Sequence, residues 1–342
     1  MKSHGSILTS EEHSLDFVGG KLRMHFPGIS LFRVACLFGL CCLLVSCYHP
    51  SPVVRPRTTE ADLSQMAYDA LGNHTGTVLV IEPRYGRILK RVGHSSDVQF
   101  ASSPFEIAEI VTAYAALDAG VINERTTLAC DESGTQTDVT GALAHSCRSF
   151  FAELSKKLTP AAFAQAANVV GFTYYGVESP NERASVTRPI SAKLPPQLSD
   201  EAFAALAARG EEMEASDLHF AQLVSSLASG TTAAERFAAY IATNARAPAP
   251  AAVSFNRQAL AVVRRGLLKA VEEGEAKAAA SIDYKVAGKL GSSAGQAVFI
   301  SYAPANDPQI GLVVYLKDAV GRDAAEVAGK FYQLHFKNNK GH

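Results

Sequence analysis

The chain of 342 residues carries 32 basic and 33 acidic side chains, for a formal charge of -1, and 47% of its residues are hydrophobic. This composition is typical of a packed globular protein, and the length allows one large domain or two small ones. A nearly neutral chain without a basic stripe excludes a global electrostatic attraction to nucleic acid or anionic lipid, so we predict no nucleic-acid partner.

The N-terminal region has the pattern of a secretory leader. An apolar run at residues 29–46 ends at Cys47, and Leu44–Cys47 reads Leu-Val-Ser-Cys, which is a lipobox. The basic residues that precede the run, as in a signal peptide, are Lys21, Arg23 and Arg33. The alternative is a single uncleaved transmembrane anchor, because the run is close to the length that spans a bilayer.

We therefore predict that residues 1–46 are a lipoprotein signal peptide and that Cys47 carries the lipid. Met24 would give a leader of more ordinary length and is a candidate for the true start. Either the lipid or the uncleaved anchor places the globular part on the periplasmic side of the bacterial cell envelope, attached to a membrane. Tyr48 follows the cysteine in place of the aspartate that is associated with inner-membrane retention, which slightly favours the outer membrane.

The six cysteines divide between the leader and the rest of the chain. Cys36, Cys41 and Cys42 would leave with the leader, and Cys47 would be lipidated. Cys130 and Cys147 then remain, and two cysteines left in an oxidising compartment often pair. We predict this disulfide, with two buried thiols as the alternative.

After the lipidation site, residues 47–60 are rich in proline and predict a semi-extended linker. The apolar, β-branched run at 77–81, the turn at 83–86 and the alternating run at 87–92 predict a hairpin with one central and one more exposed strand. Helical patterning follows at 104–119, 161–169, 200–208, 217–228, 233–243 and 257–273.

Two strands at 296–302 and 309–317 and a helix at 322–334 complete the chain. Strands at both ends of the chain around a long helical block predict one α+β domain, whose sheet joins the two ends. We place this domain at residues 61–337 and expect a polar tail at 338–342.

One segment carries most of the functional information. Ser102 to Ile122 resembles the active-site helix of penicillin-binding transpeptidase domains, which reads roughly P-G-S-T-F-K-I-x-T-A-x-A-A-L-x-x-G-V-I. The alignment needs no gap from Ile110 to Ile122. It puts Glu106 where the family has its nucleophilic serine and Glu109 where it has its catalytic lysine.

Further segments resemble the same family in the same order, over about residues 76–335. Ala142 to Phe151 resembles the segment with the second motif, S-x-N, in which Ser146 matches and Arg148 replaces the asparagine. Val286 to Ser293 resembles V-A-G-K-T-G-T-A, the third motif. The other similar segments are 170–172, 179–182, 216–230, 265–274 and 299–304.

The resemblance implies an antiparallel sheet flanked by helices, with a helical subdomain. It also implies the groups that the family's reaction needs. These are a serine activated by a lysine one helical turn away, and a strand that supplies a cation, an oxyanion-hole N–H and a hydroxyl. No intact catalytic set is expected here, because Glu106 and Glu109 supply two anions. The third motif is better kept, and the expected ligand-binding residues are Ser146, Lys289, Gly291 and Ser292.

The sequence allows more than one role for Glu106, Lys289 and Ser103. We hypothesise that Glu106 pairs with Lys289 or Arg148 and fills the old active site, while Lys289 as a solvated strand-end residue is the alternative. Ser103 is the fallback nucleophile, although Ser103 to Glu106 also reads as a capping box with serine at the N-cap and glutamate at N3. We predict no cofactor and no metal site, because the ten histidines show no metal spacing, with His94, His145 and His219 isolated.

These residues predict an envelope lipoprotein that is similar to penicillin-binding proteins but catalytically inactive. Its partners would be the peptidoglycan stem peptide, β-lactam-like ligands or proteins of cell-wall synthesis. One alternative is an active D,D-transpeptidase or D,D-carboxypeptidase with an unusual nucleophile such as Ser103. The other is a sensor of β-lactams or of the cell wall.

Overall fold

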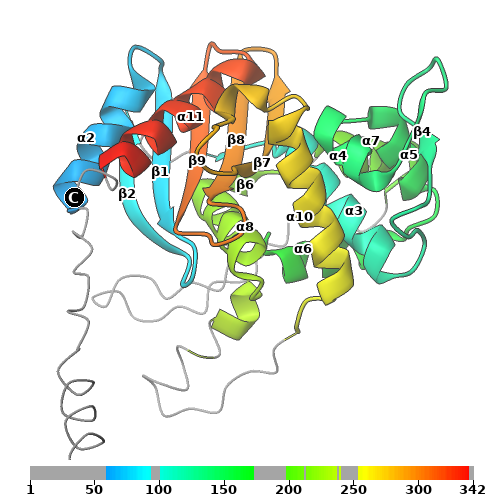
Figure 1. Ribbon diagram of the computed structural model, residues 1–342. Coiled ribbons are helices and arrows are strands. Elements are labelled where there is room, and N and C mark those ends of the chain that lie inside the picture. The colour runs from blue at the N-terminus through cyan, green and yellow to red at the C-terminus, as the bar shows by residue number, and fades with distance from the viewer. Residues whose placement is uncertain are drawn as a thin grey trace, which may run out of the picture. The chain divides into compact units, whose positions relative to one another are not determined.

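The computed structural model describes residues 59–93, 101–172, 198–211, 213–236, 239 and 253–338 (Figure 1). Several sequence predictions fall on other residues. The leader, the lipidated Cys47, most of the linker, His94 and the segment at 179–182 lie outside the described part of the chain.

A five-stranded antiparallel sheet forms the centre of the described region, in the order β2-β1-β9-β8-β7. The strands are β1 (Gly76–Glu82), β2 (Arg87–Gly93), β7 (Ala287–Ser293), β8 (Gln296–Ala303) and β9 (Ile310–Lys317). The predicted first hairpin is confirmed, with β1 inside the sheet and the more exposed β2 at its edge. The prediction that the sheet joins both ends of the chain is also confirmed, because β1 pairs with β9.

Helices cover both faces of this sheet. Two helices, α2 (Glu60–Leu71) and α11 (Gly321–Asn338), lie on one face, as Figure 1 shows, and α8 (Asp217–Ser229) and α10 (Arg257–Glu272) pack on the other. The alternation of side chains along β1 explains how one strand serves two cores. Val78 and Val80 join the cluster with α2 and α11, and Leu79 joins the cluster with α8 and α10.

A helical region packs beside the β7 edge of the sheet (Figure 1). Its helices are α3 (Ala108–Asp118), α4 (Val139–His145), α5 (Arg148–Ser155), α6 (Pro160–Val170) and α7 (Asp200–Arg209). The small pairs β3 (Ala101–Ser102) with β6 (Ala215–Ser216) and β4 (Leu128–Ala129) with β5 (Gln136–Thr137) complete it. Every residue of α3 from Ala108 to Ala116 is buried, so α3 is the central helix of this region.

The predicted helices are confirmed to within a few residues at 160–170, 200–209, 217–229, 257–272 and 321–338. Three helices were missed: α2, α4 and α5. The helix α2 starts inside the predicted linker because Thr59 and Asp62 form a capping box that begins it. Of the residues that the structure describes, none belongs to a helix both long and apolar enough to cross a membrane.

Candidate functional site

The chain enters α3 through an unusual backbone turn. Phe105 has a φ of 51°, in the left-handed region that residues other than glycine rarely adopt. Ser103 fixes this turn, because its Oγ accepts a hydrogen bond from the Phe105 N–H at 3.2 Å and donates one to the Gly210 carbonyl at 3.1 Å. A Cβ on Gly210 would lie 2.6 Å from Pro104 Cγ, so the turn fits only against a glycine.

The capping box predicted at Ser103 and Glu106 is wrong. Because of the left-handed Phe105, the helix begins with a 3-10 turn at Phe105–Ile107 and becomes α-helical at Ala108. Ser103 therefore bonds to the Phe105 N–H, and no side chain caps the 3-10 turn. Glu106 does not reach back to Ser103; it turns toward the edge strand β7.

Glu106 bonds directly to the backbone of β7. One oxygen of its carboxylate, Oε2, accepts a hydrogen bond from the Ser292 N–H at 2.9 Å. The close approach requires Gly291, where a Cβ would lie 2.8 Å from the Pro104 carbonyl oxygen and 3.3 Å from the Glu106 nitrogen. The outward N–H at Ser292 is thus satisfied by a side chain of the same molecule.

Three residues further along, Glu109 forms a fully buried ion pair. Lys289 Nζ on β7 lies 3.1 Å from Glu109 Oε2, and the two side chains are 1% and 0% exposed. Neither Glu109 oxygen accepts a well-aligned hydrogen bond, so the two groups are close in space without good hydrogen-bond geometry. A buried charge without such bonds carries a large desolvation cost.

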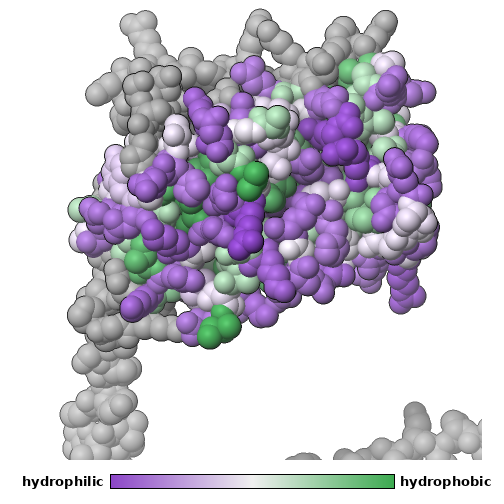
Figure 2. Space-filling model, turned by 90° about the horizontal axis from the view of Figure 1, so that it is seen from above, coloured by the Kyte–Doolittle hydropathy of each residue, from purple (hydrophilic) through white to green (hydrophobic). Residues whose placement is uncertain are grey.

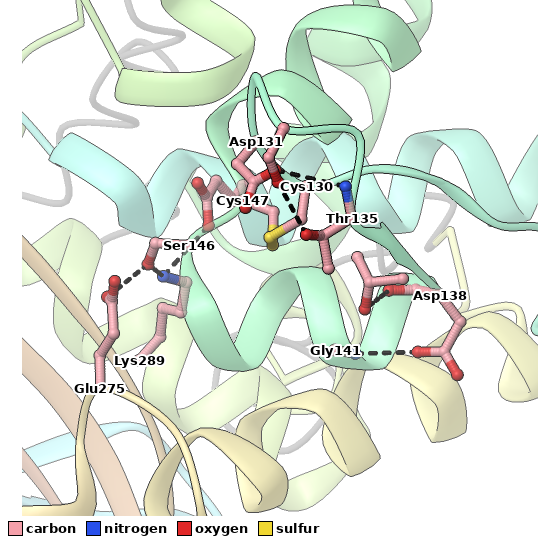
Figure 3. The surroundings of a disulfide bond; sticks show 12 residues. Cys130, Asp131, Thr135, Asp138, Gly141, Ser146, Cys147, Glu275 and Lys289 are labelled. Carbon is pink, nitrogen blue, oxygen red and sulfur yellow. Dashed lines mark hydrogen bonds and ion pairs between the residues drawn. A yellow bond between two sulfur atoms is a disulfide. The ribbon is translucent and has the colours of Figure 1, made fainter.

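Lys289 also connects to a second chain of polar groups, drawn in Figure 3. Its ammonium donates to Ser146 Oγ and to the Leu290 carbonyl, and Ser146 Oγ in turn donates to Glu275 Oε2 at 2.6 Å. An ammonium has three protons. Two of these protons are donated to Ser146 and to the Leu290 carbonyl, and the Glu109 carboxyl is the third close neighbour of the ammonium.

The charges around Glu109 shift its titration. Burial raises the pKa of Glu109 to about 8, and the positive charge of Lys289 offsets part of that rise. The carboxylates of Glu106 and Glu275 raise it further. Below about pH 8 Glu109 therefore keeps its proton, and the carboxylates of Glu106 and Glu275 lie near one lysine, so an anionic ligand would meet a net negative site.

A disulfide borders this network. The structure pairs Cys130 with Cys147, which directly follows Ser146 (Figure 3). Ser146 itself directly follows α4 as its C-cap and has φ 48° and ψ 56°, which is left-handed. The bond ties the β4–β5 hairpin to the start of α5, so both sides of Ser146 are held.

Glu275 was missed by reasoning from sequence. It reaches Ser146 because Gly274 lets the chain pass directly against the end of α4, where a Cβ would lie 2.1 Å from the Ala144 carbonyl oxygen. The Glu275 N–H then donates to that same oxygen at 3.1 Å. The glycine after the predicted helix was a signal for a tight turn, but nothing in the sequence indicated which element it would meet.

Comparison with known proteins gives the family. The family model of the penicillin-binding protein transpeptidase domain matches residues 76–333. The chain belongs to this family. No curated protein sequence matches it.

Solved structures of transpeptidase domains share the fold. The transpeptidase domain of Burkholderia pseudomallei penicillin-binding protein 3 aligns with a TM-score of 0.65 at 18% identity, covering 81% of this chain and 94% of that one. A peptidoglycan glycosyltransferase from Burkholderia ambifaria gives 0.66 at 18% identity, covering 82% and 96%. The D,D-transpeptidase domain of an Eggerthella lenta peptidoglycan glycosyltransferase gives 0.62 at 19% identity, covering 82% and 81%.

The structure brings most of the predicted site residues of this transpeptidase-like domain together. Glu106, Glu109, Ser146, Lys289 and Ser292 are linked by the contacts described above. The hypothesis that Glu106 pairs with Lys289 or Arg148 is wrong. Lys289 pairs with Glu109, which lies one helical turn deeper and is fully buried, and Glu106 bonds to the backbone of β7 instead.

Arg148 lies apart from the transpeptidase-like site. It is exposed at the start of α5 and lines a surface cavity of about 560 Å³ between α5 and α7. Both Arg209 and Glu201 also line this cavity, so its charge is mixed. The asparagine position of the family's second motif therefore contributes no cation to the network around Lys289.

The histidines in the described residues show no metal-binding arrangement. His145 is exposed at the end of α4, and His219 is buried with its Nδ1 within 2.8 Å of Ser216 Oγ. Within the described ranges no group of three or more potential metal ligands comes together.

Proposed function

We propose that this protein is a non-catalytic member of the transpeptidase family that acts as a scaffold in peptidoglycan synthesis. One observation supports this most strongly: both acidic residues at the catalytic positions are engaged within the molecule. Glu106 holds the Ser292 N–H, and Glu109 is buried against Lys289.

The reaction of the family requires a nucleophile and a base, and the two family positions for them hold Glu106 and Glu109 instead of a serine and a lysine. A serine becomes nucleophilic when an adjacent base takes its proton. Ser146 accepts from Lys289 and donates to Glu275, but it follows α4 and does not stand at the family's nucleophile position, which Glu106 occupies. Lys289 already donates to Ser146 and to the Leu290 carbonyl as an ammonium, and an ammonium cannot accept a proton.

The alternative nucleophile, Ser103, lacks the same support. Its Oγ bonds to the Phe105 N–H and to the Gly210 carbonyl, and both contacts serve the turn before α3. The nearest position that could hold a base, three residues later, is Glu106, whose carboxylate is bonded to Ser292. This arrangement favours a structural role for Ser103.

Two features favour a scaffold over a receptor for the stem peptide: the negative charge of the site, and the Glu106 carboxylate that already binds β7. The stem peptide and the β-lactams end in a carboxylate, and the Glu106 and Glu275 carboxylates both lie near the Glu109–Lys289 pair. Coulomb repulsion between like charges opposes such a ligand. In addition, the Glu106 carboxylate occupies the β7 donor that a ligand carbonyl would otherwise use.

We also propose that the protein is held in the bacterial envelope by a lipid on Cys47. The lipobox that ends at Cys47 supports this. A Cys47→Ala variant should leave the membrane fraction of cells, while Cys130→Ala should stay in it. Retention of Cys47→Ala in the membrane would favour the uncleaved anchor.

Labelling with fluorescent penicillin tests the loss of catalysis. The wild type should give no covalent adduct in a denaturing gel or by intact mass. A variant with Glu106→Ser, Glu109→Lys and Arg148→Asn restores the family residues and serves as the positive comparison. An adduct on the wild type would overturn the proposal, and an adduct that maps to Ser103 would establish the active alternative.

Reversible binding separates the scaffold from a receptor. Calorimetric titration with an N-acylated D-alanyl-D-alanine peptide should show no heat of binding to the wild type. Saturable binding to the wild type that is lost in Lys289→Ala would favour the receptor and overturn the scaffold.

A further inference from the structure

The surface offers no broad apolar interface on the face shown in Figure 2. On this face the described hydrophobic residues lie in small separate islands among hydrophilic ones. Large apolar patches mark stable interfaces, whereas single exposed apolar residues are common. A surface for association must therefore be sought in smaller features with their own complementarity.

One such feature lies after the short 3-10 helix at Lys277–Ala279. Ile282 is fully exposed, with a relative accessibility of 103%. The residues on either side of it line a pocket of about 250 Å³, whose wall comprises Ser281, Asp283, Tyr284, Gln333, Phe336 and Lys337. We call Ile282 and these six residues the knob–pocket surface.

The pocket is suited to an aliphatic side chain. Tyr284 and Phe336 pack against each other with ring centroids 4.4 Å apart and form an aromatic wall. A cavity of roughly 150 Å³ with apolar walls can hold a molecule of the size of benzene. A pocket of about 250 Å³ therefore has room for the branched side chain of an isoleucine.

The charges around the pocket are also complementary to each other. Asp283 and Lys337 are both exposed and carry opposite signs on the same rim. In a dimer with twofold symmetry both copies use the same surface. If residue i of one copy contacts residue j of the other, then residue j of the first copy also contacts residue i of the second. A protruding side chain next to a matching pocket, with one acid and one base on the rim, is self-complementary under that symmetry.

We propose that the knob–pocket surface joins two copies of this chain, with Ile282 of each copy in the pocket of the other. Asp283 of one copy would then face Lys337 of the second, and the reverse. The surface comprises seven residues, fewer than the roughly 20–30 residues that each side of a standard interface contributes, so the dimer is weak. Attachment of both copies to one membrane would raise their effective concentration.

Sedimentation velocity of the full chain in detergent, over a range of concentrations, tests the dimer. The wild type should shift from monomer to dimer as the concentration rises. Ile282→Asp should raise the dissociation constant at least tenfold. Val320→Asp is the matched control, because Val320 is 65% exposed and does not line the pocket, and it should leave the constant unchanged.

A charge exchange tests the pairing itself. Asp283→Lys and Lys337→Asp should each raise the dissociation constant about fivefold, and the double variant should return to within about twofold of the wild type. All these positions are at the surface, and near-ultraviolet circular dichroism checks the fold. A wild type that stays monomeric, an Ile282→Asp variant that dimerises normally, or a double variant that is not rescued would each overturn the proposal.

Discussion

The candidate site has two walls, the strand β7 and the start of α3, and they differ in how many residues of the family motifs they keep. The strand β7 keeps Lys289, Gly291 and Ser292, whereas the start of α3 replaces both catalytic residues with glutamate. The kept wall is nevertheless not free, because each new acid is bonded to it: Glu106 to the Ser292 N–H and Glu109 to Lys289. The family's ligand-binding residues on β7 are therefore retained, but the ligand site is not, because Glu106 and Glu109 now contact those residues.

The largest effect on stability is expected when Lys289, the β7 partner of Glu109, is replaced. Lys289→Ala leaves the Glu109 carboxyl buried and without a cation, which should lower the free energy of unfolding by about 3–5 kcal/mol at pH 9, where this carboxyl is ionised in the wild type. Urea unfolding measures this. Replacing both partners, Glu109→Leu with Lys289→Met, should recover most of the loss. As a control, Arg322→Ala in the exposed pair with Glu326 should cost less than about 0.5 kcal/mol.

If Lys289→Ala is as stable as the wild type, the contact between Glu109 and Lys289 does not stabilise the packing of α3 against β7. If the double apolar variant is no more stable than the single one, the loss comes from packing rather than from an unpaired charge.

The disulfide beside Ser146 gives the next largest effect. Cys130 and Cys147 are 17 residues apart, and closing a loop of about this size stabilises a protein by about 3 kcal/mol. The double variant Cys130→Ser/Cys147→Ser should lose about this much in urea unfolding. A reductant should lower the stability of the wild type to that of the variant and leave the variant unchanged; equal stability of all samples would mean that the bond does not form.

Stability should also depend on pH through Glu109. Burial raises its pKa from 4.5 to about 8, so between these values the folded state keeps a proton that the unfolded state has lost. The free energy of unfolding should then fall as pH rises from about 4.5 to 8, by up to about 1.4 kcal/mol per unit. Glu109→Gln should remove this slope in a series of unfolding curves, while Glu106→Gln should keep most of it; an unchanged slope in Glu109→Gln would assign the effect elsewhere.

The smallest effect concerns the bond from Glu106 to β7. Glu106→Ala leaves the Ser292 N–H without its carboxylate but partly accessible to water, so stability should fall by about 1 kcal/mol. Thermal unfolding measures this, and Glu106→Gln should lose less because its amide oxygen still accepts. Amide hydrogen exchange at Ser292 should be faster in the alanine variant, and unchanged exchange would show that Glu106 does not protect this group.

Sequence patterns predicted the fold well because they follow from local periodicity. The hairpin at β1 and β2 and the long helices α8, α10 and α11 carry strong repeats of apolar residues. The register of the family segments also placed Glu106 and Glu109 at the right helix. By contrast, α4 was missed because its seven residues are too few to show a helical period.

The partners inside the site were not predictable in the same way. The interpretation of Ser103 to Glu106 as a capping box followed local rules, but Phe105 takes a left-handed conformation that depends on contacts with Gly210, over a hundred residues away. The choice of Glu109 over Glu106 as the partner of Lys289 depends on depth below the surface, which spacing along a helix does not give. Glu275 joins the site only through tertiary packing.

The order of the strands has a consequence for how the molecule would bear a mechanical force. Four steps of roughly 4.8 Å separate β2 from β7, so these two edges lie about 19 Å apart. The described chain begins at Thr59, and the helix that follows packs on β1 and β2. A force applied at the start of the described chain would therefore load β2 and β1 first, at the edge opposite to the two glutamates, before it reached β7.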